Sequence, residues 1–389
     1  MITRRIEIAT AQPSHLWLKG LAARPMSPIA RELRKIVAEE ILLDKNDSNF
    51  PTKLIDAWQK YGFAVVRDSS IDRAVFSNAY GVNRRFFSNQ IEYKEQLGHP
   101  SATNCSGYIP PGEEISVSGR GDGKVQKNIF EMVHSSSNPK DNTIINDNLG
   151  REFNSSSNRL VDLLYERGLE LAHDIAIGLH EKGFLTPSGG RLPDDYFTKL
   201  IECTNRNRSD LNLLRQTHCN AQATDSTNFD GCSQAHTDLN FFTVLPAATK
   251  EGLQIWYENE ERPEDSGWVQ LDAPPGAYVV NLADMAEILT GGYLRSTPHR
   301  VVSPIGEDRY SIVFFVGLQR DANLQENKLK HPSMQATSSF ETEALARMPG
   351  LELTADTFTN LRCMDIGIIP EKIGKEKLGF IPLSEMKLG

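Results

Sequence analysis

A histidine and an aspartate two positions apart, His236 and Asp238, precede the β-like run NFFTVL. Residues i and i+2 of a strand point to the same face, so the imidazole and the carboxylate can be directed at one point. A second histidine, His299, begins another β-like run, HRVVSP. Two imidazoles and one carboxylate form the ligand set of a non-haem iron(II) site that keeps coordination positions open. Each piece alone is equally well explained by polar residues at strand ends, and only the combination favours a metal site.

An arginine and a serine, Arg309 and Ser311, share one face of the run RYSIVFF with Val313 and Phe315. The rest of that face is apolar, and a buried arginine requires an anionic partner. A guanidinium binds a carboxylate through two hydrogen bonds, to which a neighbouring hydroxyl adds a third. The partner is either an Asp or Glu of the chain itself, or one end of a dicarboxylic cosubstrate whose other end chelates a metal.

Short β-like runs separated by turn residues occupy positions 209–318, and this pattern predicts a sandwich, barrel or jelly roll. Positions 27–100 instead show the three-to-four spacing of helices around one β-like run, GFAVVRDSS. The predicted fold class is therefore mainly β with flanking helices. The predicted parts are an N-terminal helical and β half (1–133), a flexible polar excursion rich in Ser and Asn (134–159), a helix plus jelly-roll core (160–320), and a C-terminal helical tail that acts as a lid (321–389).

The composition excludes several classes of function. The net charge of −9, without a long basic run, argues against a nucleic-acid partner, because phosphate neutralisation needs clustered Lys and Arg. No apolar run approaches the length of a membrane span, so no membrane partner is expected. The five cysteines are odd in number, scattered and without a CxxC pair, which predicts reduced thiols and neither a disulfide framework nor a thiolate zinc site.

The first 35 residues contain seven basic and two acidic residues, a bias that slightly resembles an organellar transit peptide. The runs RRIEIA and SPIARELRKIVAEEIL instead read as a first strand and a capped helix, and this interpretation is preferred. The predicted location is the cytoplasm, with an organelle as the alternative.

The combined pattern resembles the iron(II)- and 2-oxoglutarate-dependent dioxygenases, in the branch of isopenicillin N synthase. The resemblance is carried by H-x-D at 236–238, H-R-V at 299–301 and R-x-S at 309–311, with support from GLQIW and from NLADMAEILTGGYLRSTPHRV. YGFAVVRDSSI and RRFFSNQIEYKEQLG are similar to the N-terminal half of these enzymes. The resemblance covers most of the chain and is strongest from 235 to 315.

The resemblance implies a double-stranded β-helix, a jelly-roll core flanked by helices. It also implies that His236, Asp238 and His299 bind Fe(II), and that Arg309 and Ser311 bind the distal carboxylate of 2-oxoglutarate. Molecular oxygen is the second cosubstrate of such enzymes.

Four aromatic residues are candidates for the substrate pocket. Phe315 matches a position that faces the substrate in several members of the family, and Phe241 lies close to the histidine and aspartate in sequence. Tyr80 and Tyr108 would reach the mouth of the barrel from the helical half.

One departure from the family concerns the near end of 2-oxoglutarate. Many members hold it with a tyrosine on the strand before H-x-D, but here that strand reads LNLLRQTHC. Gln216 or Asn212 would have to replace the tyrosine.

The leading hypothesis is an oxygenase that couples oxidative decarboxylation of 2-oxoglutarate to the hydroxylation, desaturation or ring closure of a small molecule. A secondary metabolite, derived from an amino acid or otherwise, is the expected substrate class. One alternative is an iron oxidase that uses no 2-oxoglutarate, in which Arg309 and Ser311 hold the substrate's own carboxylate. The other is a non-catalytic jelly-roll binding protein. The residues carry no prediction of oligomeric state.

Overall fold

The computed structural model describes residues 40–101, 104–113, 130–202, 209, 211–221, 233–259, 266–271, 273–274, 276–302, 304, 306–334 and 337–386. The basic N-terminal segment that resembles a transit peptide lies outside these residues. Among the helices in the described ranges, none combines the length and hydropathy needed to cross a bilayer.

Eight strands form the larger of two sheets, in the spatial order β1-β2-β10-β7-β12-β5-β4-β3. β1 and β2 are parallel, and the other neighbouring pairs are antiparallel. The strands are β1 (Leu42–Asp44), β2 (Phe63–Arg67), β3 (Gly107–Ile109), β4 (Glu131–Ser136), β5 (Leu213–Cys219), β7 (Phe242–Pro246), β10 (Ala277–Leu282) and β12 (Arg309–Val316).

A second sheet of four strands, in the order β6-β11-β8-β9, packs against the inner face of the larger one. Phe63 on β2 and His299 on β11 pack edge to face, with ring centroids 5.5 Å apart, and this contact joins the two sheets. This arrangement confirms the predicted fold class, a double-stranded β-helix core with flanking helices. The strands are β6 (Ser233–His236), β8 (Leu253–Tyr257), β9 (Gly267–Gln270) and β11 (His299–Val301).

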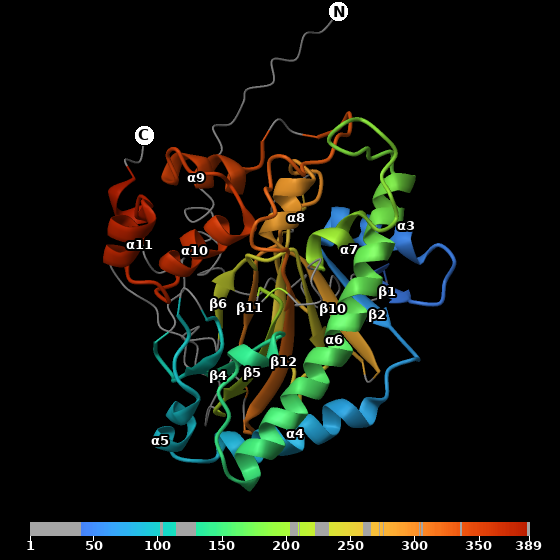
Figure 1. Cartoon of the computed structure of the whole chain (residues 1–389). Helices are drawn as coiled ribbons and strands as arrows, with labels where there is room; N and C mark the ends of the chain where they lie inside the picture. Colours follow the sequence, from blue (N-terminus) through green and yellow to red (C-terminus); the bar gives the residue numbers. More distant parts are fainter. Residues whose placement is uncertain are drawn as a thin grey trace, which may run out of the picture.

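Helices cover the outer face of the larger sheet, where the long helix α6 contacts β4, β5 and β12 (Figure 1). α3 and α4 pack on either end of α6. Strand alternation therefore gives β5 and β12 one face toward these helices and one toward the second sheet. The helices before the second sheet are α3 (Phe50–Tyr61), α4 (Arg73–Phe87), α5 (Ile91–Lys94), α6 (Asn148–Glu181) and α7 (Tyr196–Ile201).

The prediction of a flexible excursion at 134–159 is wrong. Residues 134–136 complete β4, and 148–159 form the first three turns of α6. Asp147 caps the helix by accepting a hydrogen bond from the backbone N–H of Gly150. Phe153 and Ser157 lie on the buried face, so serines that favoured a loop by composition belong instead to a packed helix.

The C-terminal tail consists of α9 (Ser339–Arg347), α10 (Ala355–Asp365) and α11 (Glu371–Leu378), and it packs beside α8 (Asp284–Leu289) (Figure 1). Arg347 and Asp365, both fully buried, form a two-point ion pair inside the tail. Arg362 on α10 lies 3.6 Å from Asp284 at the start of α8. The tail is thus anchored to the core at its middle helix, and its role as a lid stays a prediction.

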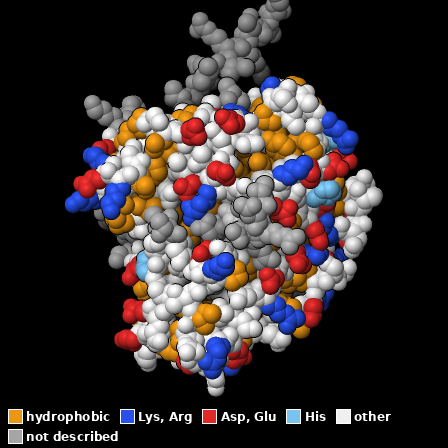
Figure 2. Space-filling model, in the orientation of Figure 1, with side chains coloured by type: hydrophobic (Ala, Val, Ile, Leu, Met, Phe, Trp, Pro, Cys, Tyr) orange, Lys and Arg blue, Asp and Glu red, His pale blue; other side chains and the backbone are white. Residues whose placement is uncertain are grey.

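The cysteines differ in one position from the prediction of reduced thiols. Cys105 and Cys363 are free. Cys219 on β5 is disulfide-bonded, so the prediction of a reduced thiol is wrong at this position. On the face shown in Figure 2, acidic and basic side chains alternate without forming a block of one sign.

Two helical glycines give opposite stability predictions. A Cβ at Gly178 of α6 would lie 2.4 Å from the Pro51 carbonyl oxygen, whereas a Cβ at Gly81 of α4 would meet nothing within 4 Å. Gly178→Ala should lower the free energy of unfolding by about 1–3 kcal/mol through overpacking against α3. Gly81→Ala should raise it by up to about 1 kcal/mol through helix propensity. Urea unfolding of both variants measures the difference, and equal signs would contradict the packing of α3 on α6.

Candidate metal centre

The two histidines lie opposite each other on neighbouring strands. His236 ends β6, His299 begins β11, and the two are paired in the antiparallel register. Their ring centroids are 4.3 Å apart. Asp238, two residues beyond β6, places Oδ1 at 3.8 Å from Nε2 of His236 and 3.6 Å from Nε2 of His299. The three side chains predicted from sequence therefore converge.

Backbone carbonyls orient both imidazoles. Nδ1–H of His236 donates to the carbonyl oxygen of Gln234 (2.7 Å), and Nδ1–H of His299 donates to that of Thr297 (3.3 Å). A donor at Nδ1 leaves the lone pair of each ring on Nε2. Both lone pairs thus face Asp238.

The larger sheet holds the other oxygen of the carboxylate. Oδ2 of Asp238 accepts hydrogen bonds from Thr243 Oγ1 on β7 (2.6 Å) and from Asn281 Nδ2 on β10 (2.8 Å). These two bonds occupy Oδ2 and direct Oδ1 toward the histidines. Neither Thr243 nor Asn281 was predicted from the sequence, since single polar residues in apolar strands carry no signal of this role.

Burial and charge set the protonation of the centre. Burial alone would raise the pKa of Asp238, but the two facing histidines and the hydrogen bonds to the carboxylate outweigh it and hold that pKa below its usual value. Burial, with a further contribution from His236, lowers the pKa of His299 to about 4. At neutral pH the centre therefore presents a carboxylate and an unprotonated imidazole, the forms that bind metal.

The donor set fits a metal ion. One ligand atom from each of the three residues lies within 4.8 Å of the others. Ligand bonds of about 2.0–2.2 Å to one ion put two donor atoms at most about 4.4 Å apart, and both nitrogen–oxygen distances lie inside that limit. Two imidazoles and a carboxylate on one side of an ion match the facial ligand set of non-haem iron(II) sites.

The predicted anion site lies on the same inner face of the larger sheet. Arg309 donates from Nε to the carbonyl oxygen of Lys250 (3.1 Å) and from Nη1 to Oγ of Ser311 (3.0 Å). Both side chains are 8% exposed. The serine thereby fixes the plane of the guanidinium, which favours bidentate binding of a carboxylate.

The distance between the metal centre and Arg309 can be inferred from the surroundings of Gly252, the residue before β8. A Cβ built there would lie 3.5 Å from both Arg309 Nε and Val301 Cγ1, so the arginine and the valine are neighbours. Val301 and His299 share a face of β11 two residues apart, which is about 7 Å. A five-carbon dicarboxylate has the length to join the two points.

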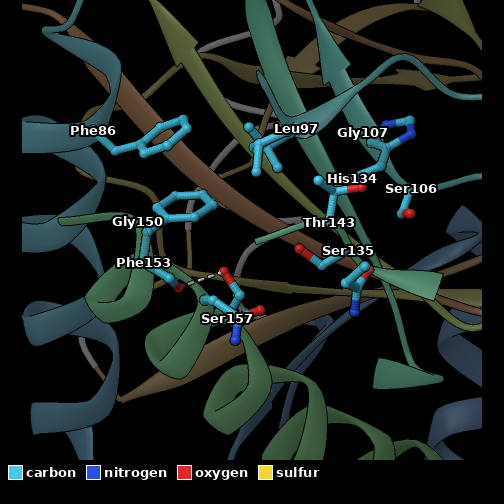
Figure 3. A pocket seen from close by; sticks show the side chains of 13 residues that line it. Phe86, Leu97, Ser106, Gly107, His134, Ser135, Thr143, Gly150, Phe153 and Ser157 are labelled. Carbon is cyan, nitrogen blue, oxygen red and sulfur yellow. Dashed lines mark hydrogen bonds between the residues drawn. The ribbon is translucent and has the colours of Figure 1, made fainter. Parts of the chain in front are cut away.

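The structure does not bring Gln216 and Asn212 to this face. Gln216 pairs with Ile312 of β12 and donates to Ser157 Oγ on α6 (2.7 Å), on the helix side of the sheet. Ser157 lines a small pocket between α6 and strands β3 and β4, and neither His236 nor His299 is among its lining residues (Figure 3). Asn212 accepts from the backbone N–H of Gly317 (3.1 Å) and is fully buried. Both amides serve internal contacts, which corrects their assignment to the near end of 2-oxoglutarate.

Only one of the four aromatic candidates lies on the inner face. Phe315 pairs with Thr243 and with Leu213, beside the metal centre, and it is half-buried. Phe241 is instead buried against Phe197 of α7, with ring centroids 4.8 Å apart.

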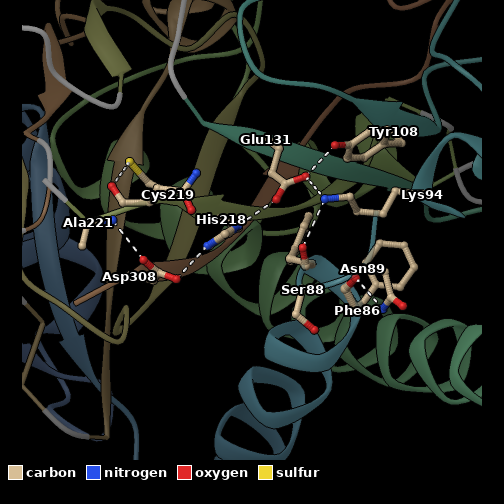
Figure 4. A network of polar contacts seen from close by, with 12 residues as sticks. Phe86, Ser88, Asn89, Lys94, Tyr108, Glu131, His218, Cys219, Ala221 and Asp308 are labelled. Carbon is tan, nitrogen blue, oxygen red and sulfur yellow. Dashed lines mark hydrogen bonds and ion pairs between the residues drawn. The ribbon is translucent and has the colours of Figure 1, made fainter. Parts of the chain in front are cut away.

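The two tyrosine candidates have partners elsewhere. Tyr80 on α4 donates to the carbonyl oxygen of Ala247 (2.9 Å). Tyr108 donates to Glu131 Oε2 (2.5 Å) in a buried network with Lys94 and His218 on the helix side (Figure 4). Burial would raise the pKa of Glu131, but these three partners hold it below its usual value, so the network is a structural charge cluster. The prediction that Tyr108 reaches the barrel mouth is therefore wrong, whereas the role of Tyr80 stays a prediction.

Arg215 was not predicted from the sequence, and it lies on the inner face of β5. It pairs with Val313 of β12, and its Cζ lies 4.9 Å from the centre of the Phe315 ring. The available signal was that Arg215 is the one charged residue in the run LNLLRQT.

Comparison with protein families identifies two matching regions. A family model described as the 2OG-Fe(II) oxygenase superfamily matches residues 213–318, which contain the two histidines, the aspartate and Arg309. A model described as the N-terminal part of non-haem dioxygenases in morphine synthesis matches residues 36–150. The two matches follow one another along the chain, as a core and the N-terminal half that precedes it.

Individual relatives agree in fold and extent. Azadirone synthase LFS of Melia azedarach is 28% identical over 294 residues, which are 72% of this chain and 83% of that protein. A full-length protein of Neurospora crassa, crystallised in complex with alpha-KG, has a TM-score of 0.63 at 18% identity, over 82% of this chain and 94% of that one. A putative 2OG-Fe(II) oxygenase family protein of Caulobacter crescentus has a TM-score of 0.60 at 24% identity, over 84% and 98%.

The hydrogen bond from Thr243 to Asp238 gives a prediction for metal affinity. Thr243→Val keeps the shape of the side chain but removes the donor, so the carboxylate is less firmly directed at the metal. Loss of such an orienting contact typically weakens metal binding by about 10- to 100-fold. Anaerobic Fe(II) titration in competition with a chelator measures the dissociation constant. Thr359→Val, the same change at a buried position of α10, is the matched control, and equal affinities for the two variants would contradict the role of Thr243.

Proposed function

Because the chain belongs to the 2OG-Fe(II) oxygenase superfamily and is an iron(II)- and 2-oxoglutarate-dependent oxidoreductase, we propose that it oxidises a small organic molecule of secondary metabolism. The observation that carries this proposal is the order of three features along the inner face of the larger sheet. The metal centre comes first, Phe315 follows, and the pair of Arg309 and Ser311 comes last.

The residues divide the work between the two cosubstrate ends. His236, His299 and Asp238 would hold the iron, with Thr243 and Asn281 fixing the carboxylate. The bound iron supplies the redox chemistry that links oxygen and the decarboxylation of 2-oxoglutarate to oxidation of the substrate.

Arg309 and Ser311 bind the distal carboxylate of 2-oxoglutarate. Their distance from His299, which matches the length of a five-carbon dicarboxylate, supports this role. Burying a guanidinium on an apolar face costs desolvation free energy, and a bound carboxylate offsets that cost. Binding at this end also fixes which end of the cosubstrate reaches the metal.

The proposed substrate is apolar in the part that is oxidised. Val313, Phe315 and Leu213 occupy the inner face of strands with neighbours on both sides, yet they are only partly buried, which favours their bordering a substrate site rather than packed core. Apolar walls around a few polar groups are typical of small-molecule sites. The relative named azadirone synthase supports a secondary metabolite. Hydroxylation, desaturation and ring closure are all compatible outcomes, since they differ in the placement of the reacting carbon.

The first test follows cosubstrate binding and turnover. Anaerobic protein with Fe(II) should develop a weak visible charge-transfer band when 2-oxoglutarate is added, and should release succinate once air and a suitable metabolite are admitted. His236→Ala removes one of two imidazole ligands and should abolish both signals. Full activity of His236→Ala would remove that residue from the ligand set.

Other results favour the two alternatives. Iron binding without the band, together with oxygen consumption in the presence of an acidic substrate, would support an oxidase that uses no 2-oxoglutarate. Failure to bind iron would support a non-catalytic binding protein.

A second test concerns the distal carboxylate. Arg309→Met should weaken 2-oxoglutarate binding by roughly 10- to 100-fold, because a charge-assisted bidentate contact is lost. Iron affinity should stay unchanged, since Arg309 touches no ligand atom. Arg309→Lys should recover part of the affinity, because it restores charge without the planar fork. Anaerobic titration of the visible band measures these constants, and a variant that binds 2-oxoglutarate like the parent protein would contradict the assignment.

A further inference from the structure

The first turn of α8 holds the loop that carries Asp238. The backbone N–H groups of residues 283, 284 and 285 donate to the carbonyl oxygens of Phe241 (3.2 Å), Asp238 (2.9 Å) and Asn240 (3.1 Å), in that order. One helix end therefore fixes the backbone between β6 and β7 at three points. A shift of this turn would move Asp238, and with it the carboxylate that faces the two histidines.

The side chain of Asp284, in the same turn, is fully buried. The hydroxyl groups of Thr237 and Ser296 lie near its carboxyl group, but no hydrogen bond of ordinary geometry satisfies either carboxyl oxygen. Within the part of the chain that the structure describes, the basic side chain that approaches it is Arg362 of α10, at 3.6 Å from Oδ2. The guanidinium of the C-terminal tail is thus the charged partner of Asp284.

Arg362 is itself held from two sides. Nη2 faces Asp284, and Nη1 lies 3.5 Å from Oδ2 of Asp365, three residues along α10. Asp365 also accepts two hydrogen bonds from Arg347 of α9. Burial alone would lower the pKa of Arg362, but Asp284 and Asp365 outweigh it and hold that pKa above its usual value. The guanidinium is therefore charged, and it joins α8 to the tail.

The pairing of Arg362 with Asp284 determines where the first turn of α8 is stable. A buried carboxyl group without a charged or hydrogen-bonding partner is costly, because it has lost its hydration. Arg362 offsets this cost while the turn stays packed. Without the guanidinium, Asp284 would be more stable nearer to water, and the turn that holds the backbone of Asp238 would move with it.

We propose that Arg362 of the C-terminal tail is a positioning residue of the metal centre, which acts through Asp284 and the first turn of α8 on the carboxylate of Asp238. It touches neither the metal nor the substrate. This inference rests on the proposed function, because it concerns the iron site of the same reaction. The role requires no movement of the tail, since the contact belongs to the packed structure.

The first arm of the experiment measures iron affinity. Arg362→Met keeps an unbranched apolar side chain but removes the charge, and it should raise the dissociation constant for Fe(II) by about tenfold or more, as loss of an orienting contact typically does. Arg362→Lys restores the charge without the planar fork and should recover part of the affinity. Anaerobic titration in competition with a chelator measures these constants.

A matched control separates this effect from general destabilisation of the tail. Leu361→Ala removes a buried side chain from the neighbouring position of α10 and destabilises the tail by leaving a cavity. Both Leu361→Ala and Arg362→Met should lower the melting temperature, but only Arg362→Met should weaken iron binding. Equal losses of iron affinity in the two variants would overturn the proposal.

The second arm asks whether Arg362 acts through Asp284. Asp284→Asn keeps the backbone N–H that holds Asp238 but removes the carboxyl group that requires a charged partner. In this background, replacing Arg362 by Met should change the iron dissociation constant by less than about threefold, because the two residues are coupled. A loss as large as in the parent background would show that Arg362 does not act through Asp284.

Hydrogen exchange tests the proposed movement without iron. In the full iron-free chain, the backbone amides of residues 284 and 285 should exchange about tenfold or more faster in Arg362→Met than in the parent, because this turn opens locally. The amides of β5 are the internal reference. Unchanged exchange at 284 and 285 relative to β5 would contradict the proposal.

The results also separate this inference from the proposed function. A parent protein that binds no iron would contradict the proposed function itself. A parent protein that binds iron, together with an Arg362→Met variant that binds it equally well, would overturn only the role of Arg362.

Discussion

The site depends on how one carboxylate, that of Asp238, divides its two oxygens between the two sheets. Oδ2 is held by Thr243 and Asn281 of the larger sheet, and Oδ1 faces the imidazoles of His236 and His299 on the smaller one. A buried carboxylate is costly unless it is hydrogen-bonded and faces a positive partner. A metal ion supplies that partner, and so the same contact that joins the sheets also creates the metal centre.

The surrounding structure keeps this carboxylate in place. The backbone N–H of Asp284, the first residue of α8, donates to the carbonyl oxygen of Asp238 (2.9 Å). Burial raises the pKa of Asp284 to about 7, and Arg362 of the C-terminal tail lies 3.6 Å from its carboxyl group. The tail is therefore linked to the metal centre through α8. This connection explains why helices that lie far beyond β12 in the sequence belong to the same packed unit as the catalytic core.

Much of the site could be predicted because strand alternation is a strong constraint. The pairs of His236 with Asp238 and of Arg309 with Ser311 each have the i, i+2 spacing that places two side chains on one face, and the structure places them so.

The residue that binds the near end of 2-oxoglutarate was predicted wrongly, because strand alternation alone does not say which of the two faces is the inner one. Gln216 replaces the family's tyrosine by position in sequence, but the register with β12 turns it to the helix side and turns Arg215 inward. Register is set by long-range pairing, which local sequence does not reveal. The polar composition of 148–159 likewise hid a helix, because Ser157 is buried on its packed face and hydrogen-bonds within the helix.

Locating the metal in a crystal would show whether these three side chains share one ion. Crystals of the protein grown anaerobically with Fe(II) and 2-oxoglutarate would be measured at the iron absorption edge for anomalous scattering. We expect one peak, bonded to Nε2 of His236, Nε2 of His299 and one oxygen of Asp238, with 2-oxoglutarate extending from it toward Arg309. An iron peak elsewhere, or a peak that lacks any one of these three ligands, would contradict this assignment.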